Sequence, residues 1–139
     1  MLTMGQGTTR RRGARKIALD VLYEHDVSGA SASEILGRYD PEPAHEFAGV
    51  LVRGVVAHRA ELDQLIASYA EDWTIERMPV IDRNLLRLGT FELLYLGDVP
   101  AAVTINEAVE LAKTFSTEDS GRFVNGILGR IASCRPSPN

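Results

Sequence analysis

Five cationic side chains lie within seven residues near the N-terminus and are the residues best suited to bind a charged ligand. They are Arg10, Arg11, Arg12, Arg15 and Lys16. Exposed cations in the first turn of a helix oppose the helix dipole, at a cost of up to about 1 kcal/mol each, and these five also repel one another. Guanidinium groups supply the charge and geometry that phosphate recognition needs. The segment therefore predicts a phosphate clamp, and a solvated run of charge is the alternative.

Contacts to phosphates do not by themselves distinguish one nucleotide sequence from another. Specific recognition of RNA needs unstacked bases that rest on aromatic or guanidinium planes. Tyr23, two turns after the cations, and Phe123 are the candidates for such stacking. Phe123 precedes Ile127 by four residues and could equally belong to the hydrophobic core. If all five cations engaged phosphates of a single strand, the logarithm of affinity would fall against log salt with a slope of about −3.5.

Residues that could carry catalysis or hold a metal show no matching pattern. His25, His45 and His58 are far apart, and none has the spacing to another His or Cys that is typical of a metal site. His25 continues an apolar stripe, as a core or edge histidine does. Cys134 lies near the C-terminus without an evident base to activate its thiol. We therefore expect no enzyme, no cofactor and no metal.

Charge is distributed unevenly along the 139 residues, although the formal net charge is only −4. Residues 1–16 hold the five cations and no acid, whereas the rest of the chain holds the other ten basic and all nineteen acidic residues. Such asymmetry suggests a basic arm for an anion on an acidic body that meets a basic partner. The single cysteine excludes an internal disulfide framework. With no signal peptide or apolar run of membrane-spanning length, we expect a cytoplasmic protein.

One stretch, from Pro79 to Leu96, must organise the elements that position these residues. It predicts a helix of about 27 Å that opens at Pro79 and ends at Gly97, a residue that favours a left-handed stop. Its polar residues form one narrow arc, and its apolar residues cover most of the remaining circumference, so we expect neighbours on several faces. Glu92 falls among the apolar residues. Because an unpartnered buried carboxylate is costly, we expect Glu92 to be hydrogen-bonded or paired.

Six other helices are predicted from apolar spacing and capping signals. They are Thr9 to about Val27, Ser31 to about Arg38, Ala44 to about Ala57, a helix after Arg59 marked by Leu62, Leu65, Ile66 and Tyr69, Thr104 to about Phe115, and a last helix capped by Thr117. Ser31–Glu34 and Thr104–Glu107 are interpreted as capping boxes. The expected fold is all-α: a compact single-domain bundle of about seven helices around the central helix 79–96. Residues 1–8 are expected to be a disordered lead-in, 9–134 the domain and 135–139 a tail.

Three segments together resemble the NusB family of transcription antitermination factors. They are RRRGARKIALDVLYEHDV near the N-terminus, VIDRNLLRLGTFELL in the middle, and DVPAAVTINEAVELAKTFSTEDSGRFVNGILGRI near the C-terminus. The last is the most specific, because INEAVELAK is followed by EDS and FVNG in order. The resemblance covers almost the whole chain. It is shared with the N-terminal domain of a ribosomal RNA cytosine methyltransferase, but this sequence ends before any methyltransferase domain.

The resemblance implies an RNA-binding adapter that pairs with NusE, a ribosomal protein, on the boxA element of nascent ribosomal RNA within the antitermination complex of RNA polymerase. By motif, the RNA surface would include the basic arm Arg10–Lys16, Tyr23, Asp119, Arg122 and Phe123. Glu76 and Asp82 would face the NusE-like partner, although Asp82 is also a favourable first-turn acid. Some family members self-associate, and the sequence leaves a homodimer open.

Two alternatives to this function remain open at the level of sequence. One is a protein-binding helical scaffold whose basic arm meets an acidic protein without direct RNA contact. The other is a stand-alone relative of the targeting domain of a ribosomal RNA cytosine methyltransferase.

Overall fold

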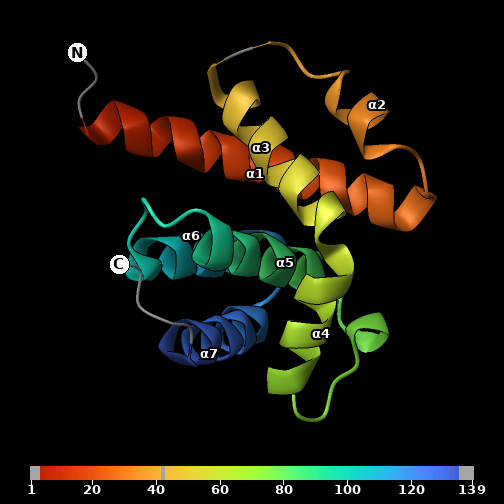
Figure 1. Ribbon diagram of the computed structural model, residues 1–139, viewed down its shortest axis with the longest axis vertical. Coiled ribbons are helices and arrows are strands. Elements are labelled where there is room, and N and C mark those ends of the chain that lie inside the picture. The colour runs from red at the N-terminus through yellow and green to blue at the C-terminus, as the bar shows by residue number, and fades with distance from the viewer. Residues whose placement is uncertain (1–3, 42, 135–139) are drawn as a thin grey trace. The chain divides into compact units, whose positions relative to one another are not determined.

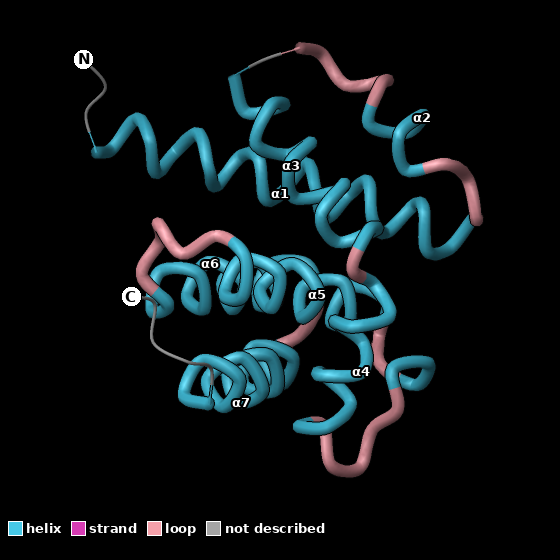
Figure 2. Tube along the Cα trace, viewed as in Figure 1, coloured by secondary structure: helices cyan, strands magenta, loops and turns pink. Residues whose placement is uncertain are grey.

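The computed structural model describes residues 4–41 and 43–134, without the side chains of residues 4–10 and 43. This described part contains seven α-helices and one 3-10 helix, and no strand (Figure 2). The elements are α1 (Met4–Ser28), α2 (Ala32–Leu36), α3 (Pro43–Ala57), α4 (Arg59–Tyr69), η1 (Ile75–Arg77), α5 (Val80–Tyr95), α6 (Ala101–Phe115) and α7 (Glu118–Cys134). The predicted all-α fold class is confirmed. Among these residues, no helix combines the length and the apolar character needed to cross a membrane.

The chain divides into two units, an N-terminal unit (Met1–Ala57) and a C-terminal unit (His58–Asn139), each held together by its own contacts. The N-terminal unit holds α1, α2 and α3, and the C-terminal unit holds α4 to α7. The expectation that residues 9–134 form one domain stays a prediction.

In the N-terminal unit, α3 packs along α1, and the short α2 contacts both helices. Small and branched apolar side chains form the contact, because they let the two helix backbones approach closely. They are Ala14, Ala18, Val21 and Leu22 of α1, Ile35 of α2, and Ala48, Leu51 and Val55 of α3, all buried. The later turns of α1 therefore anchor the helix, and its cationic start extends from these anchored turns.

The two ends of α1 can be compared with the predicted start at Thr9 and the predicted end near Val27. The helix begins at Met4, five residues before the predicted start at Thr9, and takes in part of the segment assigned to a disordered lead-in. Residues 1–3, like the predicted tail 135–139, lie outside the described residues. Extending a helix that is already fixed by packing is less costly than nucleating one. At the other end, Gly29 adopts a left-handed φ of 76° and donates its N–H to the carbonyl oxygen of His25, so α1 ends at Ser28, one residue after the predicted end near Val27.

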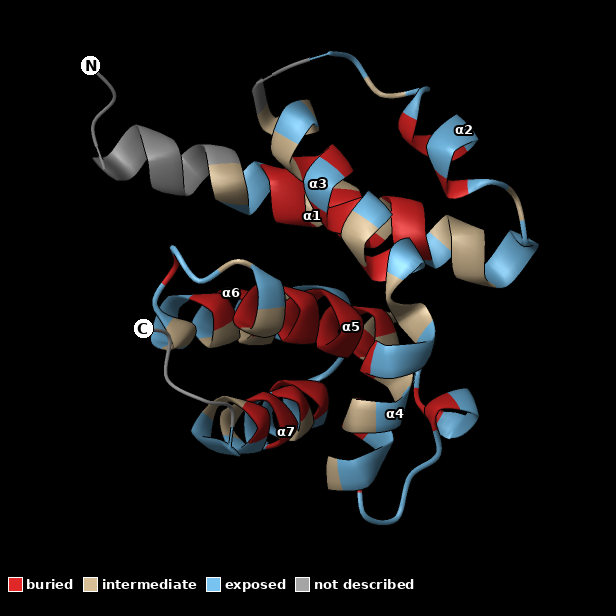
Figure 3. Cartoon of the chain, viewed as in Figure 1, coloured by how far each residue is buried: buried red, intermediate tan, exposed pale blue. Residues whose placement is uncertain are grey.

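α5 is the central element of the C-terminal unit, as predicted. It packs against α4, α6 and α7 (Figure 1). Every residue from Asn84 to Leu93 is buried (Figure 3). Pro79 and Leu96 are its N-cap and C-cap. A Cβ on Gly89 would lie 2.6 Å from Cδ1 of Leu128 in α7, so this glycine is needed for the close approach of the two helices.

Arg87, one of the polar residues of α5, is buried and paired with α4. Arg87 donates from Nε to Oδ1 of Asp63 over 2.7 Å and from Nη2 to Oδ2 over 3.0 Å. It also donates from Nη1 to Oδ1 of Asn84 over 3.1 Å. Glu92 is buried and does not lack a partner, which agrees with the expectation for this carboxylate. A bidentate carboxylate satisfies the donors of a buried guanidinium that water can hardly reach.

Two predicted helix boundaries are wrong. The helix assigned to Thr104 begins at Ala101, with Pro100 at its N-cap, so Thr104 and Glu107 lie inside the helix and are buried there instead of forming a capping box. Gly97 is not left-handed, because Gly29 is the glycine of positive φ in the described part of the chain. The backbone leaves α5 at Leu96 with φ −119° and ψ 76°, which ends the helix without a left-handed residue. By contrast, Ser31 accepts from the backbone N–H of Glu34, and the cap predicted there is confirmed.

Candidate nucleic-acid and partner interface

The cations of α1 do not form a uniform arm. The guanidinium carbon of Arg11 lies 4.9 Å from the ring centroid of Phe47 on α3, a cation–π contact that holds this side chain against the helix pair. Lys16 donates from Nζ to Oδ2 of Asp20 over 2.7 Å. Arg15 is only 4% exposed, so its guanidinium is not available at the surface. The side chain of Arg10 lies outside the described residues.

Three of the predicted RNA residues share one face of α1. Arg12, Lys16 and Tyr23 lie within about 40° of one another around the helix axis and span about 16 Å along it. Arg12 and Tyr23 are exposed and Lys16 is half-buried. This stripe presents two cations and then an aromatic ring, which is the order that a strand needs if its phosphates contact the cations and a base stacks on the ring.

A chain of hydroxyl groups joins the start of α7 to the first turn of α5. Thr117 caps α7, as predicted, because its Oγ1 accepts from the backbone N–H of Ser120 over 2.9 Å. The same Oγ1 donates to Oγ of Ser120 over 3.0 Å, and Ser120 donates to Oδ2 of Asp82 over 2.8 Å. Asp82 is 3% exposed. These bonds fix the position of a buried carboxylate beneath the N-terminus of α7.

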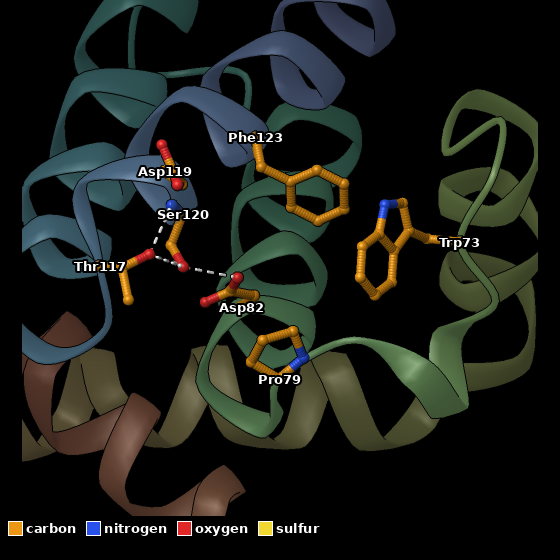
Figure 4. Close-up of a pocket in the computed structure, with 7 residues that line it drawn as sticks. All are labelled: Trp73, Pro79, Asp82, Thr117, Asp119, Ser120 and Phe123. Carbon is orange, nitrogen blue, oxygen red and sulfur yellow. Dashed lines mark hydrogen bonds between the residues drawn. The ribbon is translucent and has the colours of Figure 1, made fainter.

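Above this carboxylate lies a pocket of about 290 Å³ (Figure 4). It is lined by Trp73, Pro79, Asp82, Thr117, Asp119, Ser120 and Phe123. The Trp73 and Phe123 rings meet edge-on, with centroids 6.2 Å apart and an interplanar angle of 65°. Trp73 comes from the loop between α4 and η1 and is 49% exposed, whereas Phe123 is half-buried. The pocket therefore has aromatic walls and two carboxylates in its lining.

The remaining predicted residues lie around this pocket. Arg122 pairs with Asp119, three residues earlier on α7, and both side chains are exposed. Glu76 is exposed on η1 and lines a second hollow of about 560 Å³, which also includes Trp73 and three further carboxylates, those of Asp63, Glu71 and Asp72. Asp82, Asp119 and Phe123 are thus brought together in one pocket, with Arg122 beside it and Glu76 in the neighbouring hollow.

The predicted RNA residues fall in both units of the chain. Arg10 to Tyr23 belong to the N-terminal unit, and Asp119, Arg122 and Phe123 belong to the C-terminal unit. The hypothesis that both sets contact one strand stays a prediction.

Sequence reasoning missed Trp73 and Ser120 as site residues. The sequence did contain a signal for Ser120. It lies three residues after the cap Thr117, which is the spacing at which a side chain in the first turn can hydrogen-bond to the cap residue. Trp73 is the chain's one tryptophan, and large exposed aromatic residues are typical of binding surfaces. In the part of the chain that is described, no three His, Cys, Asp or Glu side chains are grouped so that they could hold a metal ion.

The fold and these two sites define an all-helical binding protein with a cationic helix face and an acidic pocket walled by aromatic rings. The sequence model of the NusB family matches residues 12–133. The chain belongs to the NusB family.

Several relatives are similar to this chain along nearly their full length. A protein of Salinispora arenicola named transcription antitermination protein NusB is 54% identical over 128 residues, covering 88% of this chain and 94% of the relative. A protein of the same name from Nocardioides is 50% identical over 130 residues, covering 91% and 96%. NusB of T. maritima superposes with a TM-score of 0.83 at 42% identity, covering 89% of this chain and 91% of that one. A chain from a crystal structure of the antitermination factors NusB and NusE with double-stranded RNA superposes with a TM-score of 0.82 at 32% identity, covering 91% and 98%.

Proposed function

We propose that this chain is a non-catalytic transcription antitermination factor that binds boxA-type RNA together with the NusE ribosomal protein. The observation that carries the proposal is the match to the NusB family over residues 12–133, together with relatives that bear the name of an antitermination protein. The similar chain solved with NusE and double-stranded RNA supports both partners. This function requires the cytoplasm, where the nascent RNA of bacteria is made, and the antitermination complex of RNA polymerase as its setting.

The RNA would contact the stripe of Arg12, Lys16 and Tyr23. Arg10 and Arg11 would extend the positive charge toward the start of α1, and Arg11 would do so from its position on the Phe47 ring. Arg15 would act through packing, because it is buried. On α7, the exposed guanidinium of Arg122, which pairs with Asp119, would contact a phosphate.

The NusE-like protein would dock on the acidic side of the C-terminal unit. Glu76 is exposed there, and Asp82, which is 3% exposed, lines the pocket together with Trp73 and Phe123. Ribosomal proteins are usually basic, so a surface rich in carboxylates complements one.

The test is a titration of a labelled single-stranded boxA-like RNA with the chain alone and with the NusE-like protein of the same organism. The proposal expects saturable binding that the partner strengthens. The same RNA annealed into a duplex shows whether the chain prefers a single strand. If neither RNA binds, with or without the partner, the chain is a protein-binding scaffold and the proposal is wrong.

Arg12→Glu tests the α1 stripe, with Arg53→Glu on α3 as a matched control, because both arginines are exposed on helices of the N-terminal unit. Loss of a charged hydrogen bond to phosphate should weaken RNA binding about tenfold for Arg12→Glu, and the control should stay close to the unmodified chain. Equal effects of the two reversals would mean that only overall charge matters.

Phe123→Ala separates stacking from packing. If the ring stacks on a base, RNA affinity falls while the free energy of unfolding changes by less than the 3–5 kcal/mol typical of a core phenylalanine. The half-buried position of Phe123 at the rim of the pocket supports the stacking role. A loss of that full size in urea unfolding would instead assign the ring to the core.

A further inference from the structure

A second pocket lies in the N-terminal unit and shares no residue with the RNA and NusE contacts proposed above. It has a volume of about 360 Å³ and is lined by α2, the last turns of α3 and His25 of α1. We call it the α2–α3 pocket. His25 stands about 200° around the axis of α1 from the mean direction of Arg12, Lys16 and Tyr23. The α2–α3 pocket and the cationic stripe therefore lie on opposite faces of α1.

The α2–α3 pocket has an apolar stripe on each of its two main helices. Ala32 and Leu36 are four residues apart on α2, as Val52 and Val56 are on α3, so each pair shares one helix face. The first three are buried, but Val56 is 42% exposed, and Ala57 beside it is exposed as well. Covering this surface with an apolar group of a ligand is favourable, because it removes apolar area from water.

The polar lining of the α2–α3 pocket contains one cation and no acid. It consists of Arg53, His25 and the hydroxyl groups of Ser31 and Ser33. Ser31 accepts from the backbone N–H of Glu34 over 3.3 Å, which leaves its own hydroxyl proton to be donated elsewhere. Nδ1 of His25 lies 2.7 Å from the carbonyl oxygen of Ala30, and since a carbonyl oxygen only accepts, this nitrogen carries a proton. A ligand with negative charge and hydrogen-bond acceptors suits this lining.

Arg53 is the residue that selects for charge. It makes no ion pair with another described residue. A Cβ on Gly49 would lie 2.7 Å from Nη1 and 3.1 Å from Nη2 of Arg53, so the guanidinium rests against α3 one turn before its own Cα, where only a glycine leaves room. Gly49 and Val56 are seven residues apart, which is about 10 Å along the helix axis. The cation and the exposed apolar surface are thus presented at the spacing of a short extended peptide, which spans about 10 Å in three residues.

We propose that the α2–α3 pocket binds a short extended segment of a partner protein, in which an acidic side chain pairs with Arg53 and an apolar side chain two residues later packs on Leu36, Val52 and Val56. Residues two apart in an extended chain lie on the same side. A guanidinium matches the two oxygens of a carboxylate. A phosphate would also suit Arg53, but it would leave the apolar lining uncovered. The volume is at the lower limit of ligand sites and suits one or two side chains.

The first experiment titrates the full chain, labelled with ¹⁵N, with N-acetyl-Glu-Gly-Leu-amide and with the matching glutamine peptide at millimolar concentrations. Backbone amide chemical shifts report where each peptide binds. We expect saturable shifts at residues 31–36 and 52–57 with the glutamate peptide. Binding of the glutamine peptide should be about 10- to 100-fold weaker, as for a lost hydrogen bond to a charged group. No saturable shift at these amides with the glutamate peptide would overturn the proposal.

Two pairs of variants test the charge and the apolar contact separately. Arg53→Gln should weaken binding of the glutamate peptide by the same factor, and Arg38→Gln is its control, because Arg38 is exposed in the same unit and does not line the pocket. Val56→Thr should weaken binding by about fourfold, the value of one methyl group. Val50→Thr should leave it unchanged, since Val50 is an exposed valine of α3 outside the pocket. The amide spectrum of each variant shows whether the fold is intact. Unchanged binding in Arg53→Gln or Val56→Thr, or an equal loss in its control, would contradict the proposal.

Inorganic phosphate and the single-stranded boxA-like RNA are the competing ligands. The proposal expects that neither displaces the glutamate peptide from the unmodified chain. Displacement by phosphate would show a general anion site, and displacement by RNA would make the pocket part of the RNA surface. Either result would overturn the proposal. All of these outcomes are independent of whether RNA binds with the NusE-like protein, so a failure here leaves the proposed function standing.

Discussion

Arg87 and Asp82 are both buried charged residues of α5, but their side chains are satisfied to different degrees. Arg87 makes a bidentate pair with Asp63 and a further bond to Asn84. Asp82 uses one oxygen and leaves the other without a partner. The first arrangement stabilises the contact between α4 and α5. The second costs stability in the free protein, and a group that costs stability in this way is a candidate for binding.

Arg87→Met should destabilise the protein by about 3 kcal/mol in urea unfolding. Breaking a buried ion pair by removing one partner typically costs 3–5 kcal/mol. We expect the lower end of this range, because the Asp63 carboxylate left behind is 25% exposed and its Oδ2 lies 3.8 Å from Nε of Arg59. Arg59→Met is the matched control and should change stability by less than about 1 kcal/mol, as an exposed pair does. Similar losses in the two variants would show that the Arg87–Asp63 pair contributes no more than a surface contact.

Tyr95 gives a pH-dependent prediction. Its hydroxyl donates to Oε1 of Glu61 over 2.7 Å. This hydrogen bond is the main cause, and partial desolvation the second, of a pKa of Tyr95 above its usual 10.0. The folded protein therefore holds the phenol proton more tightly than the unfolded chain. The stabilisation is complete below pH 10 and is lost as the pH rises through the raised pKa. In an absorbance titration, Glu61→Gln should move the pKa of Tyr95 back toward 10, and Tyr95→Phe identifies its signal. An unchanged titration would mean that the bond is absent in solution.

At the scale of elements, the contact between α5 and α7 determines the geometry of the pocket. Gly89 lets α7 approach through Leu128, while Ser120 bonds to Asp82 near the other end of the contact. Phe123 and Asp119 are carried on the first turns of α7, so their positions depend on this packing. Helix packing therefore forms most of the pocket, and the loop before η1 contributes Trp73.

Gly89→Ala should lower stability by about 1–3 kcal/mol, the usual cost of overpacking a core, because the new Cβ would lie 2.6 Å from a buried leucine methyl. Gly126→Ala on α7 is the matched control. Nothing lies within 4 Å of a Cβ at this exposed position, so the better helix propensity of alanine should raise stability by about 0.5–1 kcal/mol. Opposite signs in chemical unfolding support the close contact, and a gain in both variants would rule it out.

At the scale of the whole molecule, the small net charge of −4 conceals two surfaces of opposite sign. The cations of α1 suit RNA, and the carboxylates around Trp73 suit a basic protein. The cations of α1 lie in the N-terminal unit and these carboxylates in the C-terminal unit, which also holds the predicted RNA residues Asp119, Arg122 and Phe123.

The salt dependence of RNA binding should reflect the burial of Arg15. With Arg10, Arg11, Arg12 and Lys16 on phosphates, these four cations should contribute about −2.8 to the slope of log affinity against log salt, and Arg122 about −0.7 more; Arg12→Gln should make the slope shallower by about 0.7. The measurement is a set of RNA titrations between low and moderate salt. Arg15→Gln should leave the slope unchanged even if it lowers stability. A slope that responds to Arg15 and not to Arg12 would contradict this assignment.

The sequence by itself determined the helices and the family. Apolar spacing located α5 to within one residue at each end, and local signals located the Ser31 cap and the Thr117 cap, because these depend on neighbours along the chain. The same reasoning misplaced the starts of α1 and α6, since packing extends a helix past a weak or misleading local signal. Only the tertiary structure decided that Arg15 is buried, that Arg11 lies on Phe47, and that Trp73, Asp82 and Phe123 line one pocket. Those facts depend on contacts between residues far apart in the chain, which no local pattern encodes.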